Sequence, residues 1–307
     1  MINRSTWIVA SIVLIGVSDG AMAQPLELRT EKLGVVMNQV RQRQPMTVRS
    51  DDIVTGATAA VVEALGGYRL DDSVDVRTRS VALLGMIGRE SSNGRIRSAA
   101  SHQLALAIAD SDAPLAKRAA ECLLKIAPAD FSALSRRDIA RAFDEGLKSP
   151  AIVRLVGWLG MANRMNDLGE LVDSGPAPAS AQSGRWFGKV AWSARLARAR
   201  LGSAIDLQKC IERFEAERDE VAKITVLTAD LVYVARDGAF EAIKDVVRAN
   251  GRLPAACKGG PGTAHAQYAL HYLAEGLSEF PVPIKFIGGY TEGDRIAALN
   301  WLRRQGQ

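Results

Sequence analysis

Aromatic residues are scarce in this sequence: Phe, Trp and Tyr together make up 6% of its 307 residues. Strand-rich sandwiches depend on aromatic and β-branched residues in alternating patterns, and no sustained apolar–polar alternation occurs between turn signals. Hydrophobic residues make up 48% and charged residues 24% of the chain, which is typical of a folded protein and excludes a disordered one. We therefore expect an all-α fold.

Cysteine is also rare, with only Cys122, Cys210 and Cys257 in the chain. They show no CxxC or other zinc-type spacing. Cys122 lies in a helical apolar stretch and is expected to be a small core residue. An oxidising compartment permits one disulfide, and we predict the pair Cys210–Cys257, because Cys257 lies in a loop that can fold back.

Residues that carry common chemistry are equally sparse. The histidines are His102, His265 and His271, and the last two lie six residues apart, on nearly opposite faces of one expected helix. Helical metal ligands need a spacing of three or four residues, so no metal site is predicted. The sequence has no GxSxG motif, and the glycine-rich stretch 259–262 before Thr263 lacks the Gly-Lys-Ser/Thr ending and the preceding strand of a phosphate-binding loop. We accordingly predict no catalytic residue, no metal and no cofactor.

Only one long apolar run occurs, at the N-terminus. One cationic residue, Arg4, precedes an eleven-residue run over 7–17, and Ala21-Met22-Ala23 follows it. These are the parts of a secretory signal, so we predict cleavage after Ala23 and a periplasmic or secreted protein. The alternative is an uncleaved anchor, but the run is shorter than the ~20 apolar residues of a bilayer span. No Cys follows the run, and no other stretch predicts a stable membrane span after signal removal.

The charge of the chain is mildly positive. The formal net charge is +5, and the signal contains one Arg and one Asp, so its removal leaves +5 on the remaining 284 of 307 residues. A charge this small over this length indicates little beyond solubility. For an exported protein it predicts no nucleic-acid partner.

Apolar residues recur at spacings of three and four along most of the chain, which predicts amphipathic helices. Glycine, proline and capping residues mark their ends. Gly66-Gly67 is expected to end the helix that starts at Asp51, and the helix over 220–235, apolar nearly all round, is expected to be deeply buried. Residues 280–290 are expected to be irregular. The expected helices span 28–42, 51–65, 76–87, 96–109, 114–127, 135–147, 150–162, 165–172, 186–201, 204–216, 220–235, 240–249, 263–277 and 294–304.

Alternate helices begin at a nearly constant interval. The expected starts near 76, 114, 150, 186 and 220 are separated by 38, 36, 36 and 34 residues. A period in the thirties with two helices per unit is typical of an α-solenoid, in which each helix pair buries its apolar face against the next.

Three segments, 76–88, 115–126 and 194–202, carry Ala, Arg and Leu at the spacing found in HEAT repeats, and Asp110, Asp112, Asp206 and Asp237 fall near the turns. Over about residues 50–250 the chain therefore resembles a HEAT-like repeat protein. Tetratricopeptide repeats have a similar period, but their Trp, Gly, Tyr and Pro positions are not in register. The resemblance implies a right-handed α-solenoid of stacked antiparallel helix pairs and a protein-binding surface.

Composition shifts divide the chain into six parts. Residues 173–184 are rich in Pro, Ala, Ser and Gly, which predicts a flexible connector. The last sixty residues fit the repeat poorly, so we expect a cap or a specific binding feature there. The parts are a signal peptide (1–23), an N-terminal segment (24–50), HEAT-like repeats (51–172), the connector (173–184), further HEAT-like repeats (185–249) and a C-terminal helical cap (250–307).

Arginine and tryptophan, a mixture enriched at interface centres, cluster just after the connector. A solvated helix face is the alternative. The candidate partner-binding residues are Arg185, Trp186, Lys189, Trp192, Arg195 and Arg198, with Phe187 and Arg200 nearby.

The sequence predicts a non-catalytic exported scaffold or adaptor that binds another protein, in an envelope or secretion assembly. A first alternative is a cell-envelope enzyme acting on peptidoglycan or another polymer, with Glu212, Glu215 and Glu217 as its carboxylates. A second alternative is a helical domain that binds a small ligand.

Overall fold

The computed structural model describes residues 26–109, 112–174, 190–249, 251–253 and 263–305. Within these ranges every regular element is a helix, and one isolated bridge pairs Arg252 with Ala264. The expected all-α fold is confirmed. None of the described helices is long and apolar enough to cross a membrane.

The helices follow the predicted ranges closely. They are α1 (Leu26–Arg41), α2 (Ser50–Thr55), α3 (Ala59–Tyr68), α4 (Val74–Glu90), α5 (Gly94–Ile108), α6 (Ala113–Leu123), η1 (Pro128–Asp130), α7 (Ala133–Asp144), α8 (Pro150–Trp158), η2 (Ala162–Arg164), α9 (Met165–Asp173), α10 (Val190–Arg200), α11 (Ala204–Ala216), α12 (Glu220–Ala222), η3 (Lys223–Leu227), α13 (Thr228–Val234), α14 (Asp237–Arg248), α15 (His265–Gly276) and α16 (Glu292–Gln305). Here η1 and η2 are 3₁₀-helical turns and η3 is a π-helical turn.

The prediction of a single helix over 51–65 is wrong in two respects. The segment forms two helices, α2 and α3, separated at Gly56, and Thr58 caps α3 by accepting a hydrogen bond from Val61 N at 3.4 Å. Gly66 and Gly67 do not end this helix, which continues to Tyr68. Gly66 is buried beneath Gln103, whose Oε1 would lie 2.3 Å from a Cβ at that position. This glycine therefore serves helix packing and not helix termination.

The expected helix over 220–235 is continuous but contains a π-helical turn, η3. Thr228 donates a hydrogen bond from its hydroxyl to Lys223 O at 3.1 Å, and the Tyr272 hydroxyl on α15 donates to Thr225 O at 2.8 Å. These side chains satisfy carbonyls in a turn whose hydrogen-bonding pattern departs from that of an α-helix. As expected the segment is deeply buried, with Ile224, Leu227 and Leu231 in the core.

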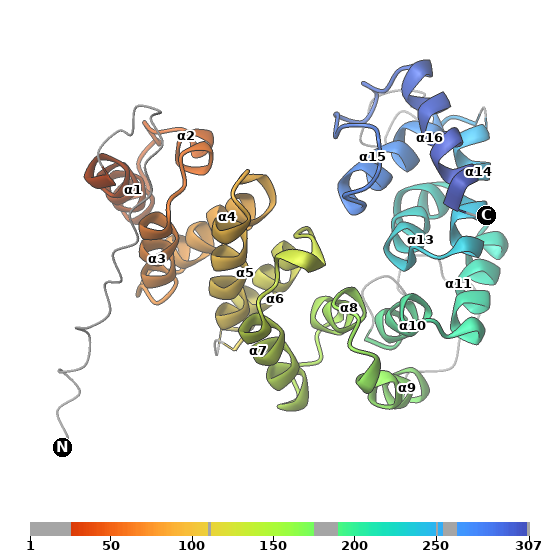
Figure 1. The fold of residues 1–307 in the computed structure, drawn as a ribbon, viewed down its shortest axis with the longest axis horizontal. Coiled ribbons are helices and arrows are strands. Elements are labelled where there is room, and N and C mark those ends of the chain that lie inside the picture. The colour runs from red at the N-terminus through yellow and green to blue at the C-terminus, as the bar shows by residue number, and fades with distance from the viewer. Residues whose placement is uncertain (1–25, 110–111, 175–189, 250, 254–262, 306–307) are drawn as a thin grey trace.

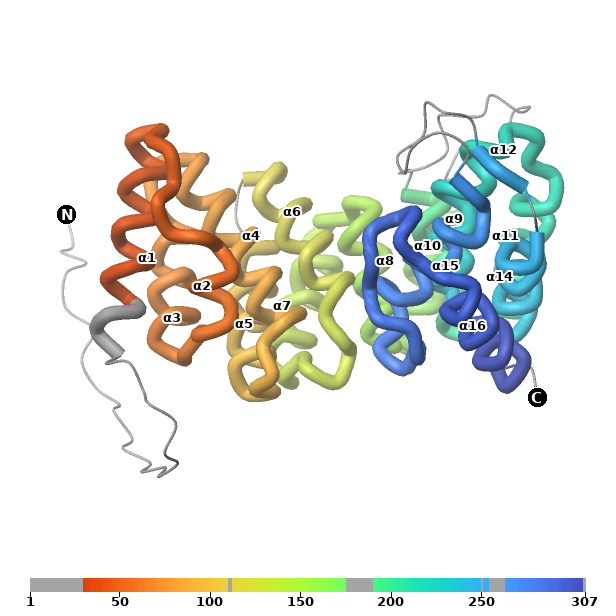
Figure 2. Tube along the Cα trace, turned by 90° about the horizontal axis from the view of Figure 1, so that it is seen from above, coloured from red at the N-terminus to blue at the C-terminus, as the bar shows by residue number. Residues whose placement is uncertain are grey.

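Neighbouring helices pack in a repeating order. A helix typically contacts the next helix and the next but one, as α4 contacts α5 and α6. Buried apolar residues form two core clusters, one from α1 to α10 and the other from α10 to α16, and Tyr233 packs against both. Figure 2 shows the helices succeeding one another along the long axis, with α1 and α2 at one end and α11 and α14 at the other.

The row of helices bends. In Figure 1 the chain descends through α3 to α7, turns at α8 to α10, and rises again through α11 and α13 to α14 and α16. Lys125, just after α6, reaches Glu275 on α15 at 2.6 Å. The bend therefore brings the C-terminal helices back to the middle of the N-terminal row.

Candidate partner-binding cleft

A cleft of about 600 Å³ lies on the inner side of this bend. One wall includes Arg89 in the last turn of α4 and Lys125 in the segment after α6, and the opposite wall comes from the end of α15 and from Ile284. Trp158, Arg200 and Trp301 also line it. The lining mixes apolar and charged side chains, and a concave site of this size can hold a small ligand or a short peptide segment.

An ion pair between Lys125 and Glu275 links the two walls. The Nζ–Oε1 distance is 2.6 Å, and His271 Nε2 lies 3.9 Å from the other carboxylate oxygen. Burial acts to raise the pKa of Glu275, but the hydrogen bond and charge of Lys125 outweigh it, so the pKa of Glu275 is lowered. Glu275 is therefore a carboxylate at neutral pH. The two residues are 150 positions apart, and no local pattern could have paired them.

Arg200 lies against an aromatic surface of the cleft. Its guanidinium carbon lies 4.2 Å from the centroid of the Trp158 ring and 5.4 Å from that of Tyr233, and Nη1 donates a hydrogen bond to Tyr233 O. Trp158 is fixed in turn, because its Nε1 donates to Ile126 O at 2.9 Å. Burial lowers the pKa of Arg200, although a guanidinium remains charged at any physiological pH.

A buried network close to Arg200 joins three helices. Asp230 on α13 forms an ion pair with Arg154 Nη2 at 2.8 Å and accepts a hydrogen bond from Trp192 Nε1 at 2.7 Å. The Tyr233 hydroxyl donates to Arg154 O at 2.5 Å. Because these bonds connect α8, α10 and α13, the network fixes the join between the two core clusters. Trp192 is a core residue within it, which corrects the expectation that its ring lies on an exposed binding face.

The other predicted partner-binding residues have two outcomes. Arg195 and Arg198 both face the buried Asp206, with Nε–Oδ distances of 3.5 and 3.1 Å, and remain 23% and 26% exposed. The remaining three, Arg185, Trp186 and Lys189, lie outside the described residues. Binding through these arginines and the flanking segment therefore stays a prediction.

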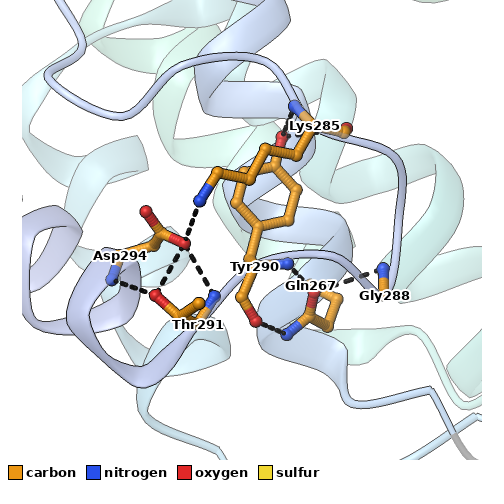
Figure 3. Close-up of polar contacts among 6 residues, drawn as sticks. All are labelled: Gln267, Lys285, Gly288, Tyr290, Thr291 and Asp294. Carbon is orange, nitrogen blue, oxygen red and sulfur yellow. Dashed lines mark hydrogen bonds and ion pairs between the residues drawn. The ribbon is translucent and has the colours of Figure 1, made fainter.

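The segment before α16 forms a tightly bonded loop over residues 281–291, which sequence reasoning expected only as an irregular stretch. Figure 3 shows Gln267 on α15 bonded to it: Oε1 accepts from Gly288 N at 3.2 Å and Tyr290 N at 3.0 Å, and Nε2 donates to Tyr290 O at 2.9 Å. The Tyr290 hydroxyl accepts from Lys285 N at 3.0 Å and lies 3.2 Å from Lys285 O. Lys285 Nζ pairs with Asp294 at 2.7 Å and, as the leading cause, lowers the pKa of Asp294 to about 2.

This loop presents two apolar side chains to solvent. Ile284 lines the cleft and is 53% exposed, and Phe286, two residues later, is 78% exposed. A turn closed by Gly289 N donating to Phe286 O at 2.9 Å places Gly288 at φ 103°, where glycine is favoured. A Cβ at Gly289 would lie 2.9 Å from the Phe286 ring, so this glycine lets the ring lie against the backbone. The expectation of a cap or a specific binding feature in the last sixty residues stays a prediction, and it named none of these residues.

The carboxylates proposed for an enzyme lie on or just after α11, away from the cleft lining. Glu217 accepts from Arg213 and from Asp219 N at 3.0 Å, and Glu212 accepts from Gln208 at 3.1 Å. Glu215 is exposed. The three therefore do not converge on a site.

The histidines of the described residues do not gather at one place with other metal-binding side chains. His265 is buried, His102 and His271 are partly buried, and no group of metal-binding side chains occurs among the described residues. Burial raises the pKa of Cys122 and raises that of Cys210 to about 12, so both favour the thiol form. Cys257 and the glycine stretch 259–262 lie outside the described residues, and the Cys210–Cys257 disulfide stays a prediction.

No protein-family model, curated protein or solved structure matches this chain. The geometry of the cleft therefore carries the functional conclusion.

Proposed function

We propose that this protein is a non-catalytic exported scaffold that holds a segment of another protein in its cleft. The cleft lies between two arms, the helices before the bend (α1–α7) and those after it (α11–α16). In this proposal the arms form a right-handed α-solenoid of HEAT-like helix pairs. The observation that carries it is the combination, at one cleft, of an aromatic lining, a partly buried arginine and the exposed Ile284, on a fixed loop that also exposes Phe286. Exposed aromatic side chains on rigid supports are typical anchors of protein interfaces.

The repeat is supported by polar contacts that recur at one interval along the chain. Arg77 pairs with Asp112, Arg97 with Asp130, and Trp158 Nε1 with Ile126 O, at separations of 35, 33 and 32 residues. Further along, Arg200 bonds to Tyr233 O and Arg236 to Arg200 O, at separations of 33 and 36. Contacts between segments about one repeat apart are expected of stacked helix pairs, so they support the proposed repeat.

Two acidic side chains of the cleft are held by cations, which favours binding over polymer hydrolysis. Asp130 accepts from Arg97 Nε at 2.8 Å, and Glu275 is held by Lys125. Glycoside hydrolysis needs one carboxyl group with a raised pKa to act as the general acid. The pKa of Glu275 is instead lowered, which makes it a structural counter-ion.

Export is part of the proposal and has its own test. The signal over residues 1–23 lies outside the described residues. The mature chain is expected to begin at Gln24 and to fractionate with the periplasm or the medium, as intact-protein mass and N-terminal sequencing will determine. A full-length chain that stays in the cytoplasmic fraction contradicts this part.

Partner binding is tested by replacing Phe286. In the Phe286→Ser variant, we expect the thermal midpoint to remain unchanged, because the side chain is mostly exposed, and the complex with the partner to be lost. The measurement is the mass of the native protein after gentle extraction, by size-exclusion chromatography with light scattering. Ile205→Ser is the matched control, because Ile205 is a similarly exposed apolar residue, 71% exposed, on α11, which contributes neither to the cleft lining nor to the 281–291 loop. A monomeric wild-type protein, or equal losses in both variants, contradicts the proposal.

A further inference from the structure

Arg200 differs from the other cations that line the cleft. Arg97 pairs with Asp130, Lys125 pairs with Glu275, and Arg89 pairs with the adjacent Glu90. The described residues offer Arg200 no carboxylate within ion-pair distance, and its one hydrogen-bond acceptor there is the carbonyl of Tyr233. Its pKa is lowered mainly by burial and further by another cation, Arg236. The cleft therefore contains one desolvated positive charge without a counter-ion.

The surroundings of Arg200 hold its guanidinium in one orientation. Trp158 covers one face at 4.2 Å, and Tyr233 provides a second ring at 5.4 Å. A guanidinium carries five N–H donors in a planar fork, whose geometry matches a carboxylate. Because only one donor is used by the Tyr233 carbonyl, the fork retains donors for an anion that enters the cleft.

Arg200 also has a structural role that has to be separated from binding. Tyr233 is in the last turn of α13, and cations near a helix C-terminus stabilise its unpaired carbonyls. Replacing Arg200 will therefore affect folding whether or not it binds a ligand. Loss of stability alone cannot identify its function, so the test needs two ligands that differ only in charge.

We infer that Arg200 binds the C-terminal carboxylate of the partner segment, with the preceding apolar side chain against Trp158, Phe240 and Trp301. This inference rests on the proposed function and adds the chemistry of the segment. A chain terminus is favoured because it places one planar carboxylate beside an apolar side chain, which matches a single unpaired guanidinium beside the aromatic residues of the cleft. The fixed geometry of Arg200 provides specificity for a planar anion over a neutral amide.

The test compares three synthetic peptides by calorimetry with the mature chain, residues 24–307. They are N-acetyl-Leu-Phe with a free carboxylate, the same peptide as its C-terminal amide, and N-acetyl-Leu-Asp-Phe amide, which carries an internal carboxylate. We expect the free acid to bind about tenfold or more tightly than the amide, as for loss of one charge-assisted hydrogen bond. The internal carboxylate is expected to bind no better than the amide.

Two variants assign this preference to Arg200. Arg200→Gln is expected to reduce the affinity for the free acid to that for the amide, while leaving the affinity for the amide unchanged. If that variant does not fold, Arg200→Lys keeps the charge but lacks the planar fork, and the ratio of the two affinities is expected to fall severalfold. Arg295→Gln is the control, since Arg295 pairs with Glu292 on α16 and does not line the cleft.

Each outcome has one meaning. Equal affinities for acid and amide, or a ratio that both Arg200 variants leave unchanged, overturn the inference. Tight binding of the internal carboxylate overturns its assignment to a chain terminus. If the peptides show no preference but the Phe286-dependent complex persists, the inference fails and the proposed function stands. If the acid binds through Arg200 but no protein complex exists, the proposed function fails and the anion site stands.

Discussion

Asp230 is the residue on which the join between the two arms depends most. It is almost fully buried, pairs with Arg154 and accepts a hydrogen bond from Trp192. A buried carboxylate is stable only while such partners are kept, and loss of its charge leaves Arg154, 22% exposed, without a counter-ion.

We therefore expect Asp230→Asn to lower the free energy of unfolding by about 3–5 kcal/mol. The control is Asp144→Asn, which removes the carboxylate of the exposed Arg164–Asp144 pair at 2.6 Å. A surface pair of this kind contributes about 0–1 kcal/mol. Urea unfolding of both variants measures the difference, and similar losses would show that the Asp230 network does not stabilise the join.

At the scale of the element, the crossing of α8 and α10 depends on a missing side chain. A Cβ at Gly157 would lie 2.7 Å from Ala197 Cα and 2.5 Å from the Tyr233 hydroxyl oxygen. The Ala197 backbone cannot move without moving α10. The two helices can thus approach this closely only because residue 157 is glycine.

Gly157→Ala is expected to destabilise the protein by about 1–3 kcal/mol through overpacking. Gly67→Ala is the matched control, because nothing lies within 4 Å of a Cβ at that helical position. Alanine reduces the conformational entropy that the unfolded chain loses on folding, so Gly67→Ala is expected to stabilise the protein by about 0.5–1 kcal/mol. Thermal unfolding of both variants gives the signs, and a neutral Gly157→Ala would mean that the helices can separate at little cost.

Helices were predictable from the sequence because their apolar spacing, caps and breakers are local signals. Ser203, Asp112 and Thr291 illustrate this, since each caps the helix expected to follow it. The cleft was not predictable, because Lys125 and Glu275 or Arg154 and Asp230 meet only through the bend of the whole chain. Trp192 was misassigned to a binding face for the same reason: its partner, Asp230, comes from a helix 38 residues later.

At the scale of the whole molecule, the Lys125–Glu275 pair closes the bend. The two side chains are 48% and 28% exposed, so the pair contributes only about 0.2–1 kcal/mol. Its effect is therefore expected on the separation of the arms more than on global stability. Because the pKa of Glu275 is lowered in the folded protein, the pair is complete above about pH 4.3, the ordinary glutamate value, and is lost as the pH falls below it.

Charge reversal tests the role of this pair. Lys125→Glu and Glu275→Lys are each expected to increase the radius of gyration in small-angle scattering at pH 7, since like charges then face each other across the cleft. The double reversal restores an ion pair and is expected to restore the radius. If neither single variant changes the scattering, the arms are held by the buried network alone.

The central claim is that a partner protein occupies the cleft, and site-specific photocrosslinking in living cells tests it most directly. A benzophenone amino acid replaces Ile284, which lines the cleft, or Leu134, which is 49% exposed on α7 and does not line it. The account predicts one adduct of defined mass from position 284 and none from position 134. Absence of an adduct at 284, or the same adduct from both positions, would contradict it.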